Sequence, residues 1–271
     1  MRPSHELYST LAPSYREHFD RPHRRAYDDL AWDQVQKLLP ERGPIVDVGC
    51  GVGRWAERLL ALGHEVIGIE PAAGMIAELR RADHGHGFTL IAEPMETAVL
   101  PEASAGMVLA LGSLQYSADP ESMIRRFASW VRPGGLVVVL VDSLVALVIE
   151  LLRDGKHEEA MQRLRTRIGV WAIEGQSAEM HLMDQQRLRR AFDDAGLLDI
   201  QVTGLLVTAA AMGPAQLADR LAGDWDGHMV IEQQLQAYPV LADVGKHLLA
   251  TGRRPASDAG GYQPRGSEMG E

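Results

Sequence analysis

The stretch Ile45–Trp55, IVDVGCGVGRW, sets glycines at positions 49, 51 and 53 directly behind an apolar run. Such a run predicts a buried strand, and the glycines that follow it predict a turn into a helix. Because glycine has no Cβ, backbone N–H groups in this turn can come close to a ligand. The stretch therefore predicts a ligand-binding turn between a strand and a helix.

Two kinds of phosphate-binding loop are excluded by the same residues. A P-loop needs Lys and then Ser or Thr after its last glycine, whereas Arg54 and Trp55 follow Gly53. The dinucleotide fingerprint needs a glycine at its sixth place, which, counted from Gly49, is Arg54. Asp47, inside the strand end, also suits a cationic amino-acid ligand better than a pyrophosphate.

Outward from this loop, short apolar runs alternate with stretches of helical periodicity. This alternation predicts βαβ units and a parallel sheet whose strands are covered on both faces. The strand-like runs are PIVDVG (44–49), HEVIGIE (64–70), FTLIA (88–92), GMVLAL (106–111), LVVVLV (136–141), LDIQVTGLLV (198–207) and KHLLATGRR (246–254).

The loop resembles motif I of the class I S-adenosylmethionine-dependent methyltransferases. Glu70 ends the next strand-like run about 20 residues beyond the loop, where a cofactor ribose needs a carboxylate. The sequence is similar to the small-molecule members of this family (methyltransferase type 11) over residues 8–254, and most specifically over 45–140. The resemblance implies an α/β, doubly wound, Rossmann-like fold: a seven-stranded, mostly parallel sheet with an antiparallel last strand and helical lid insertions.

The resemblance also implies S-adenosylmethionine as the cofactor. Tyr8 and Tyr15 match a tyrosine motif near the amino end of many members, which implies that Tyr15 caps the sulfonium and Arg25 contacts the cofactor carboxylate. The stretch PMETAVLP (94–101) resembles the segment that reaches the adenine, although the family usually has Asp where Glu96 stands. The implied cofactor-binding residues are Tyr15, Arg25, Asp47, Gly49, Gly51, Gly53, Glu70, Met75, Glu96, Thr97 and Leu111.

The catalytic residues are predicted less directly by the sequence than the cofactor-binding residues. Methyl transfer from a sulfonium mainly requires an aligned nucleophile, so a base is optional. His18 and Tyr15 are candidates, because a phenol or carbon acid would benefit from a base such as His18. Gln115, at a place where related proteins often carry histidine, Tyr116 and His181 are further polar residues predicted near the transfer site, although a structural role explains each of them as well.

Plainer interpretations accompany several other residues. Cys50, the one cysteine, excludes an intramolecular disulfide and is expected to pack inside the loop. Arg54 is expected at the surface or facing a carboxylate, with contact to an acceptor carboxylate as an alternative. His84 and His86 lack a third ligand, so they predict a solvated turn and no metal site.

We expect one methyltransferase domain over residues 1–254. It would carry a helical cap over 1–40 and helical lid insertions over 143–183 and 208–240, with a polar loop at EGQSAEM (174–180). The segment 255–271 is rich in Gly, Pro and Ser and predicts a disordered tail.

The formal net charge of −10 disfavours a nucleic-acid partner or an anionic membrane. No stretch predicts a signal peptide or a membrane span, so a cytoplasmic protein is expected. The sequence does not decide between a monomer and a homodimer. The favoured function is methyl transfer to an O, N or C nucleophile of a small-molecule acceptor, such as a specialised metabolite. The alternatives are a tRNA-modifying carboxyl methyltransferase, whose ending resembles GKHLLATGRRP, and a non-catalytic protein that binds S-adenosylmethionine.

Overall fold

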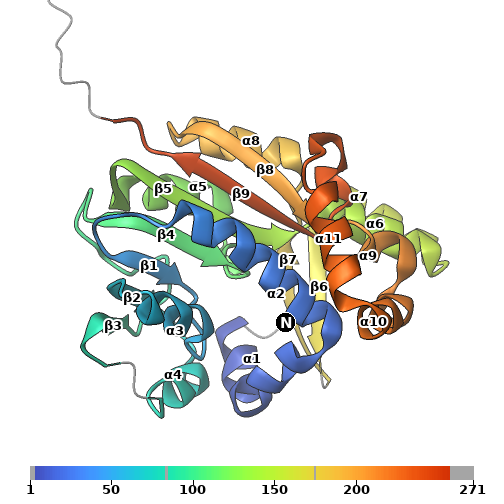
Figure 1. Ribbon diagram of the computed structural model, residues 1–271, viewed down its shortest axis with the longest axis horizontal. Coiled ribbons are helices and arrows are strands. Elements are labelled where there is room, and N and C mark those ends of the chain that lie inside the picture. Colours follow the sequence, from blue (N-terminus) through green and yellow to red (C-terminus); the bar gives the residue numbers. More distant parts are fainter. Residues whose placement is uncertain (1–3, 83–84, 174, 257–271) are drawn as a thin grey trace, which may run out of the picture.

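The computed structural model describes residues 4–82, 85–173 and 175–256 of the chain, and its centre is one seven-stranded sheet (Figure 1). From β3 to β5 all neighbouring strands run parallel, whereas β9 is antiparallel to both β5 and β8. The predicted mostly parallel sheet with an antiparallel last strand is therefore confirmed. In spatial order the strands are β3 (Phe88–Ile91), β2 (Val66–Ile69), β1 (Ile45–Val48), β4 (Ala105–Leu111), β5 (Val131–Asp142), β9 (His247–Arg253) and β8 (Leu198–Leu205).

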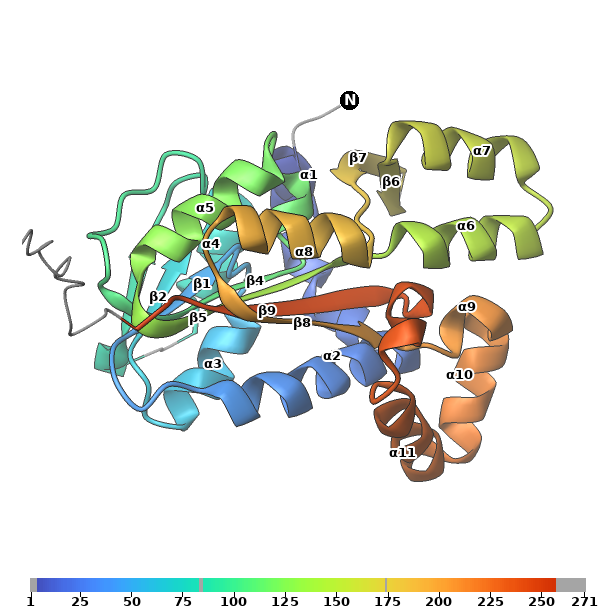
Figure 2. The same ribbon diagram turned by 90° about the horizontal axis from the view of Figure 1, so that it is seen from above.

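Helices cover both faces of this sheet (Figure 2). One face carries α5 (Pro120–Trp130) and α8 (Gln185–Asp194), and the other carries α2 (Pro22–Val35) and α3 (Arg54–Ala61). Successive residues of a strand point to opposite faces, so a strand covered on both sides needs an apolar run rather than an alternating pattern. In β1, for example, Val46 and Val48 pack in one core and Ile45 in the other.

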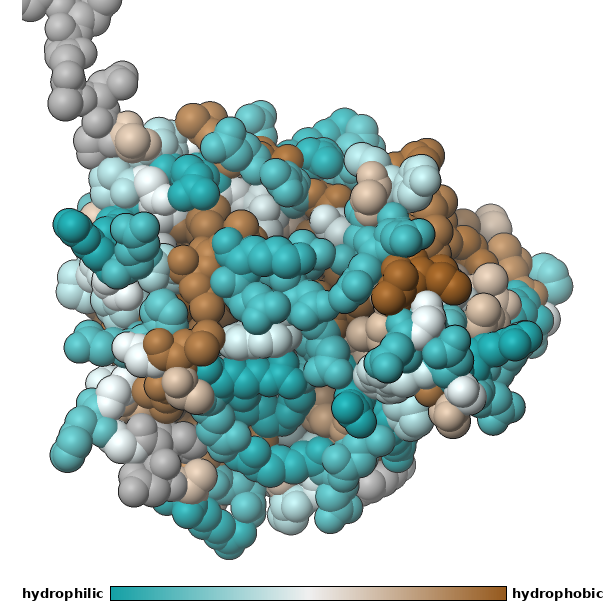
Figure 3. Space-filling model, viewed as in Figure 1, coloured by the Kyte–Doolittle hydropathy of each residue, from teal (hydrophilic) through white to brown (hydrophobic). Residues whose placement is uncertain are grey.

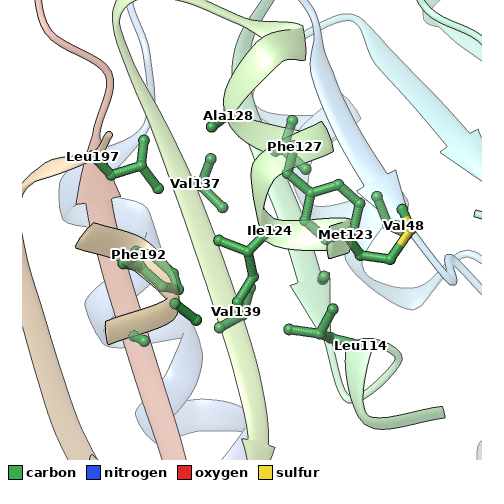
Figure 4. Packing of buried hydrophobic residues seen from close by; sticks show 14 of the residues in the cluster. Val48, Leu114, Met123, Ile124, Phe127, Ala128, Val137, Val139, Phe192 and Leu197 are labelled. Carbon is green, nitrogen blue, oxygen red and sulfur yellow. The ribbon is translucent and has the colours of Figure 1, made fainter. Parts of the chain in front are cut away.

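The core under α5 and α8 is built from interlocking aromatic and branched side chains. Figure 4 shows Ile124 of α5 and Phe192 of α8 near Val137 and Val139 of β5, and Phe127 of α5 on the far side of Ile124, next to Met123. Apart from Met123, all of these side chains are completely buried. Burial of one such side chain contributes about 1.5–3 kcal/mol, so this face fixes the strands whose ends carry the site.

The remaining α-helices lie at the amino end, between β2 and β3, and after β5 and β8. The α-helices are α1 (Ser4–Leu11), α4 (Ala73–Leu79), α6 (Leu144–Arg153), α7 (His157–Thr166), α9 (Ala209–Met212), α10 (Pro214–Gly223) and α11 (Trp225–Leu235). Short 3₁₀ helices span Ala12–Ser14, Arg16–Asp20, Gln36–Leu38, Gly85–Gly87, Leu114–Tyr116 and Pro239–Val244.

The segment 143–183 differs from the helical insertion that the sequence led us to expect. Beyond α6 and α7 it forms a β-hairpin of β6 (Ile168–Ile173) and β7 (Gln176–His181). The expected polar loop falls mostly in β7, where Ala178 and Met180 are buried and Glu179 between them is exposed. This alternation is the signature of a strand, and the polar residues around it concealed the pattern.

Other segments follow the expected boundaries more closely. The part of 1–40 that the structure describes is mainly helical, and 208–240 holds α9, α10 and α11. The Arg-Pro-Gly-Gly turn at 132–135 lies within β5, beside a register shift in its pairing with β4. Most of the expected tail, residues 257–271, lies outside the described residues.

The viewed face of the molecule is mainly hydrophilic (Figure 3). Hydrophobic residues gather where α9 to α11 lie and in a second band on the left of this view. Val230 and Ile231 of α11 are each about half exposed. Among the described residues, no helix combines the length and the apolar character needed to cross a membrane.

Candidate functional site

The glycine loop between β1 and α3 has a backbone that other residues would not readily adopt. Gly49, Gly51 and Gly53 have φ angles of +74°, +56° and +84°. A Cβ on Gly49 would lie 2.4 Å from the Cβ of Ser113, so this position has no room for a side chain. At Gly51 the nearest atom to such a Cβ belongs to the Tyr15 ring, at 3.9 Å. The loop therefore presents open backbone beneath Tyr15.

Two buried carboxylates lie under this loop. Glu70 is 6% exposed; one of its oxygens accepts a hydrogen bond from the N–H of Gly51 at 2.9 Å and the other from that of Ala72 at 2.8 Å. Asp47 is 2% exposed, and its Oδ2 has no hydrogen-bond partner among the described residues. Burial, with the charge of Glu70, raises the pKa of Asp47 to about 7. A cationic ligand would relieve this unpartnered carboxylate.

Three adjoining cavities follow the carboxyl edge of the sheet, and Gly49 and Tyr116 line all of them. The outer cavity, of about 280 Å³, lies at Pro94 and Glu96. The middle cavity, of about 90 Å³, lies at Glu70. The main cavity, of about 350 Å³, extends from the glycine loop past α2 to the ends of β5 and β9.

Most of the predicted cofactor residues come together along these cavities. Tyr15, Gly49, Gly51 and Leu111 line both the main and the middle cavity. Glu70 and Met75 line the middle cavity, and Glu96 lines the outer one. Asp47 and Gly53 lie outside the three linings: Asp47 is the third residue of β1, just before the loop, and Gly53 directly precedes α3.

Arg25 is a correction to the predicted set, because its side chain points away from the cavities. It is 65% exposed and lies over the ring of Trp225, 4.6 Å from the ring centre. Arg24 lines the main cavity instead. One residue along an α-helix turns the side chain by about 100°, so motif matching that is off by one position selects the wrong face.

Thr97 also lies away from the described cavity walls. It is exposed, and its hydroxyl donates a hydrogen bond to the carbonyl oxygen of Pro94 at 3.3 Å. This bond holds the turn that carries Glu96.

The candidate catalytic residues divide in the same way. Tyr15, Gln115 and Tyr116 line the main cavity. His18 is buried with its ring centre 6.4 Å from that of Tyr15, but in the described part of the chain it lies outside the lining of all three cavities. His181, on β7, also lies outside these linings. The two predicted histidines are therefore poorly placed for contact with an acceptor.

Sequence reasoning missed the polar end of the main cavity. Asp142 ends β5 and His247 begins β9, and the two residues are direct cross-strand partners. Because β9 is antiparallel, its first residue rather than its last lies at the carboxyl edge of the parallel strands. The sequence does show Asp142 directly after one apolar run and His247 directly before another. The two residues can be placed together only when the antiparallel direction of β9 is taken into account. The polar and charged lining is His23, Arg24, Arg54, Gln115, Asp142, Lys246 and His247.

Two of the cavity cations are neutralised by acidic partners. Arg54 donates to Asp28 at 2.7 Å, and its guanidinium lies 3.3 Å from the centre of the Phe19 ring. Lys246 contacts Glu150 at 2.7 Å. Arg24 forms no ion pair with any described residue. Arg54 thus faces a carboxylate of the protein, and Arg24 is the cation left for a ligand.

Aromatic rings close the main cavity on one side. Tyr8 of α1 stacks on Trp171 of β6 with ring centres 5.4 Å apart and an angle of 12°, and its ring centre lies 5.5 Å from that of Tyr116. Figure 2 shows α1 beside the β6–β7 hairpin. We call Tyr8, Tyr116 and Trp171 the aromatic roof.

No group of three or more His, Cys, Asp or Glu side chains is placed to hold a metal ion within residues 4–82, 85–173 and 175–256. His84, part of the expected solvated turn, lies outside these residues. Cys50 is buried between the loop glycines, and burial raises the pKa of its thiol.

Comparison with known proteins identifies a family. A family model described as a methyltransferase domain matches residues 15–202, which is more than half of the chain. The tRNA 5-carboxymethoxyuridine methyltransferase of Escherichia coli K12 is 27% identical over 138 residues, 48% of this chain and 53% of that protein. A ubiquinone biosynthesis O-methyltransferase of Rhodopseudomonas palustris BisA53 is 32% identical over 131 residues, 45% of this chain and 51% of that protein.

The chain thus spans about half the length of the curated relatives it matches. Among solved structures, an S-adenosylmethionine-dependent methyltransferase from Mesorhizobium loti aligns with a TM-score of 0.55 at 19% identity, covering 82% of this chain and 97% of that one. At this identity the likeness shows a shared fold.

Proposed function

The chain belongs to the class I S-adenosylmethionine-dependent methyltransferases, and from this premise we propose that it transfers a methyl group from that cofactor to a small-molecule acceptor in the main cavity. When bound, S-adenosylmethionine supplies a methyl group on a positively charged sulfur, which is electrophilic without further activation. The protein's part is to hold both reactants in line and to exclude water.

The residues along the three cavities fit this cofactor. Glu70 has a lone pair left on each oxygen after its two backbone hydrogen bonds, so it can accept bonds from ribose hydroxyls. Asp47 offers an unpartnered carboxylate to the ammonium group, and Arg24 offers an unpaired cation to the cofactor carboxylate. Glu96 would face the adenine from the outer cavity, and Tyr15 would cover the open backbone of Gly51.

The observation that carries the proposal is that the cavities adjoin one another. The cavities beside Glu70 and Glu96 provide for a nucleoside, and the main cavity continues from the same glycine loop. Its volume of about 350 Å³ lies within the range of about 300–1,000 Å³ that is typical of small-molecule sites. A protein that only bound the cofactor would not need this additional space.

Two features favour a small-molecule acceptor over tRNA: the aromatic roof over the main cavity and the negative net charge of the chain. The aromatic roof covers the main cavity, so an RNA nucleotide would have to leave its stack and displace it. RNA phosphates would also meet a protein of net charge −10. One relative named above acts by name on tRNA and the other by name in ubiquinone biosynthesis, so the relatives' names leave both acceptor classes available.

The test is methyl transfer from radiolabelled S-adenosylmethionine to a metabolite extract, bulk tRNA and a protein fraction. We expect label in the low-mass fraction, and we expect Glu70→Ala to lose both label transfer and binding of S-adenosylhomocysteine. Label in tRNA would contradict the acceptor class. Tight binding of the cofactor with label in no fraction would contradict catalysis and favour a cofactor-binding protein.

A further inference from the structure

Resting on the proposed function, we propose that His247 is the general base of the acceptor site, oriented by Asp142, and that the acceptor is a weakly acidic hydroxyl compound, a phenol or an enol. The sequence had suggested His18 for this role. His247 takes its place because it lines the main cavity, whereas His18 does not line it with the described residues.

The topology of the sheet brings the pair together. Asp142 is the last residue of β5 and His247 the first of β9, and they face each other across the antiparallel ladder. The Asp142 Oδ1 to His247 Nδ1 distance is 3.6 Å, which is longer than a hydrogen bond but close enough for the carboxylate to interact with the imidazole once it takes up a proton. The Tyr27 ring, centred 4.5 Å from that of His247, restricts the imidazole from α2. With Nδ1 beside the carboxylate, Nε2 is the ring nitrogen left to accept a proton.

Gln115 gives independent evidence for a hydroxyl ligand. Its Nε2 donates to Asp142 Oδ2 at 2.7 Å, and because a carboxylate accepts hydrogen bonds, the amide orientation is fixed. The other amide atom, Oε1, is buried and has no hydrogen-bond partner among the described residues. Gln115 is 4% exposed and lines the main cavity. An unpartnered buried acceptor atom at this wall calls for a donor on the ligand, and a hydroxyl supplies one.

The electrostatics keep His247 in its neutral form before the reaction. Burial, and the positive charges of Lys246 and Arg24 together with His23, hold its pKa well below the usual range. The imidazole is therefore neutral at physiological pH. The titratable and charged groups facing it are His23, Arg24 and Tyr27 of α2, Asp142 of β5, and the neighbouring Lys246, which is paired to Glu150 of α6.

The same surroundings select the acceptor. A carboxylate is already ionised, so it needs no base and has no hydrogen to donate to the unpartnered Oε1 of Gln115. A phenol or enol needs a base before its oxygen can attack the methyl group, and the neutral imidazole of His247 can take that proton. The aromatic lining, including Tyr8, Tyr15 and Trp171, suits a planar acceptor.

In the proposed step, the acceptor O–H proton passes to Nε2 of His247. The oxygen lone pair forms the new O–CH3 bond while the S–CH3 bond breaks, and the electrons of that bond stay on sulfur. The products are the methyl ether, S-adenosylhomocysteine and one proton, which His247 releases to solvent. Atoms and charge therefore balance without any further reactant.

A spectroscopic test uses 4-nitrophenol, whose phenol and phenolate forms absorb differently. The probe is added to the complex with S-adenosylhomocysteine at a pH below the pKa of the free probe. We expect a stronger phenolate band with the wild type than with His247→Gln. The matched control His157→Gln, at the exposed start of α7, should keep it. A wild type without the band, or an unchanged band in His247→Gln, would overturn the assignment.

A kinetic test separates a base from a structural residue. With the weakly acidic probe 4-methoxyphenol, His247→Gln should lower kcat by about 100- to 10,000-fold with little change in KM. With 4-nitrophenol, which is largely ionised at neutral pH, the loss should be much smaller. Asp142→Asn should lower kcat less than His247→Gln and shift the pH profile. Equal losses with both phenols would indicate a structural role and overturn the proposal.

The failures of the two proposals are distinguishable. Binding of S-adenosylhomocysteine, measured by calorimetry, should be the same in the wild type and in these variants. Methylation of carboxylate or amine probes but of no phenol or enol would overturn this inference and leave the proposed function intact. A wild type that does not bind S-adenosylhomocysteine would overturn the proposed function, and the inference would fall with it.

Discussion

At the scale of single residues, the buried carboxylate of Asp47 favours a cationic ligand. Its carboxylate is buried at the end of β1 without a described hydrogen-bond partner on Oδ2, and its pKa is raised to about 7. A group in this state costs stability in the free protein unless it takes up a proton. A cation beside it would favour the ionised form, so the same residue that destabilises the free protein favours a sulfonium and ammonium ligand.

Cofactor binding should therefore release protons near neutral pH. In calorimetric titrations at pH 6.5 in buffers of different ionisation enthalpy, we expect S-adenosylmethionine to release a fraction of a proton per site. The release should fade above pH 8, where Asp47 is already ionised. Asp47→Asn should abolish most of it and weaken binding. Proton uptake by the wild type, or identical release by the variant, would contradict this role of Asp47.

The stability of the cofactor-free protein should respond to the same residue with a defined sign. Because the pKa of Asp47 is about 7 when folded and about 3.9 when unfolded, its neutral form favours folding. This stabilising contribution is lost as pH rises from about 4 to 7, and above pH 7 the effect of Asp47 on the free energy of unfolding no longer changes. The Asp47→Asn variant should therefore become more stable than the wild type across this pH range, by up to about 4 kcal/mol in the free energy of unfolding above pH 7. Urea denaturation at several pH values measures it, and a difference that does not vary with pH would contradict it.

At the scale of elements, β9 and the β6–β7 hairpin build the part of the site that motif matching does not reach. The antiparallel direction of β9 brings His247 beside Asp142. The hairpin brings Trp171 against Tyr8 and so joins the amino-terminal helix to an insertion more than 150 residues away. The acceptor end of the cavity is thus assembled from elements that are distant in sequence.

Removal of the Trp171 ring should loosen the aromatic roof. Loss of the stack on Tyr8 should cost about 1–2 kcal/mol of stability. Trp171→Ala should raise the KM for the acceptor by about tenfold, because closure over the ligand is weakened, with a smaller effect on S-adenosylhomocysteine binding. Trp171→Phe keeps a stacking ring and should stay close to the wild type. An unchanged acceptor KM in Trp171→Ala would show that the roof does not contact the acceptor.

Local features could be predicted from the sequence more readily than the meeting of distant residues in the folded protein. The strand-like runs of the sheet and the glycine turn after β1 follow from patterns within a few residues, and both could be anticipated. The choice between Arg24 and Arg25 depends on the rotation of α2, and motif spacing alone does not resolve a single residue step. The hairpin was concealed because Glu179 and its polar neighbours mask a short alternating pattern. His247 required the direction of a strand to be combined with the position of another strand's end.

At the scale of the whole molecule, a chain with a net charge of −10 holds a main cavity whose lining includes basic and aromatic side chains. The net charge of −10 repels polyanions, whereas Arg24, inside the cavity, can attract a small anionic group. The fold is shared with methyltransferases at low identity, so the cavity lining rather than the fold distinguishes the acceptor.

Weak binding of RNA should follow from this charge distribution. In fluorescence anisotropy with labelled tRNA at about 150 mM salt, we expect a Kd weaker than about 100 µM, the weak end of non-specific nucleic-acid binding. Neutral-pH binding in the micromolar range that weakens steeply with added salt would reveal a basic surface and revive the tRNA acceptor.

The most direct measurement is a crystal structure of the chain with S-adenosylhomocysteine. We expect the ribose hydroxyls within hydrogen-bond distance of Glu70, the amino-acid end of the ligand between Asp47 and Arg24, and the sulfur facing the main cavity. A ligand that binds away from the glycine loop, or one whose sulfur faces away from the main cavity, would contradict methyl transfer to an acceptor held there.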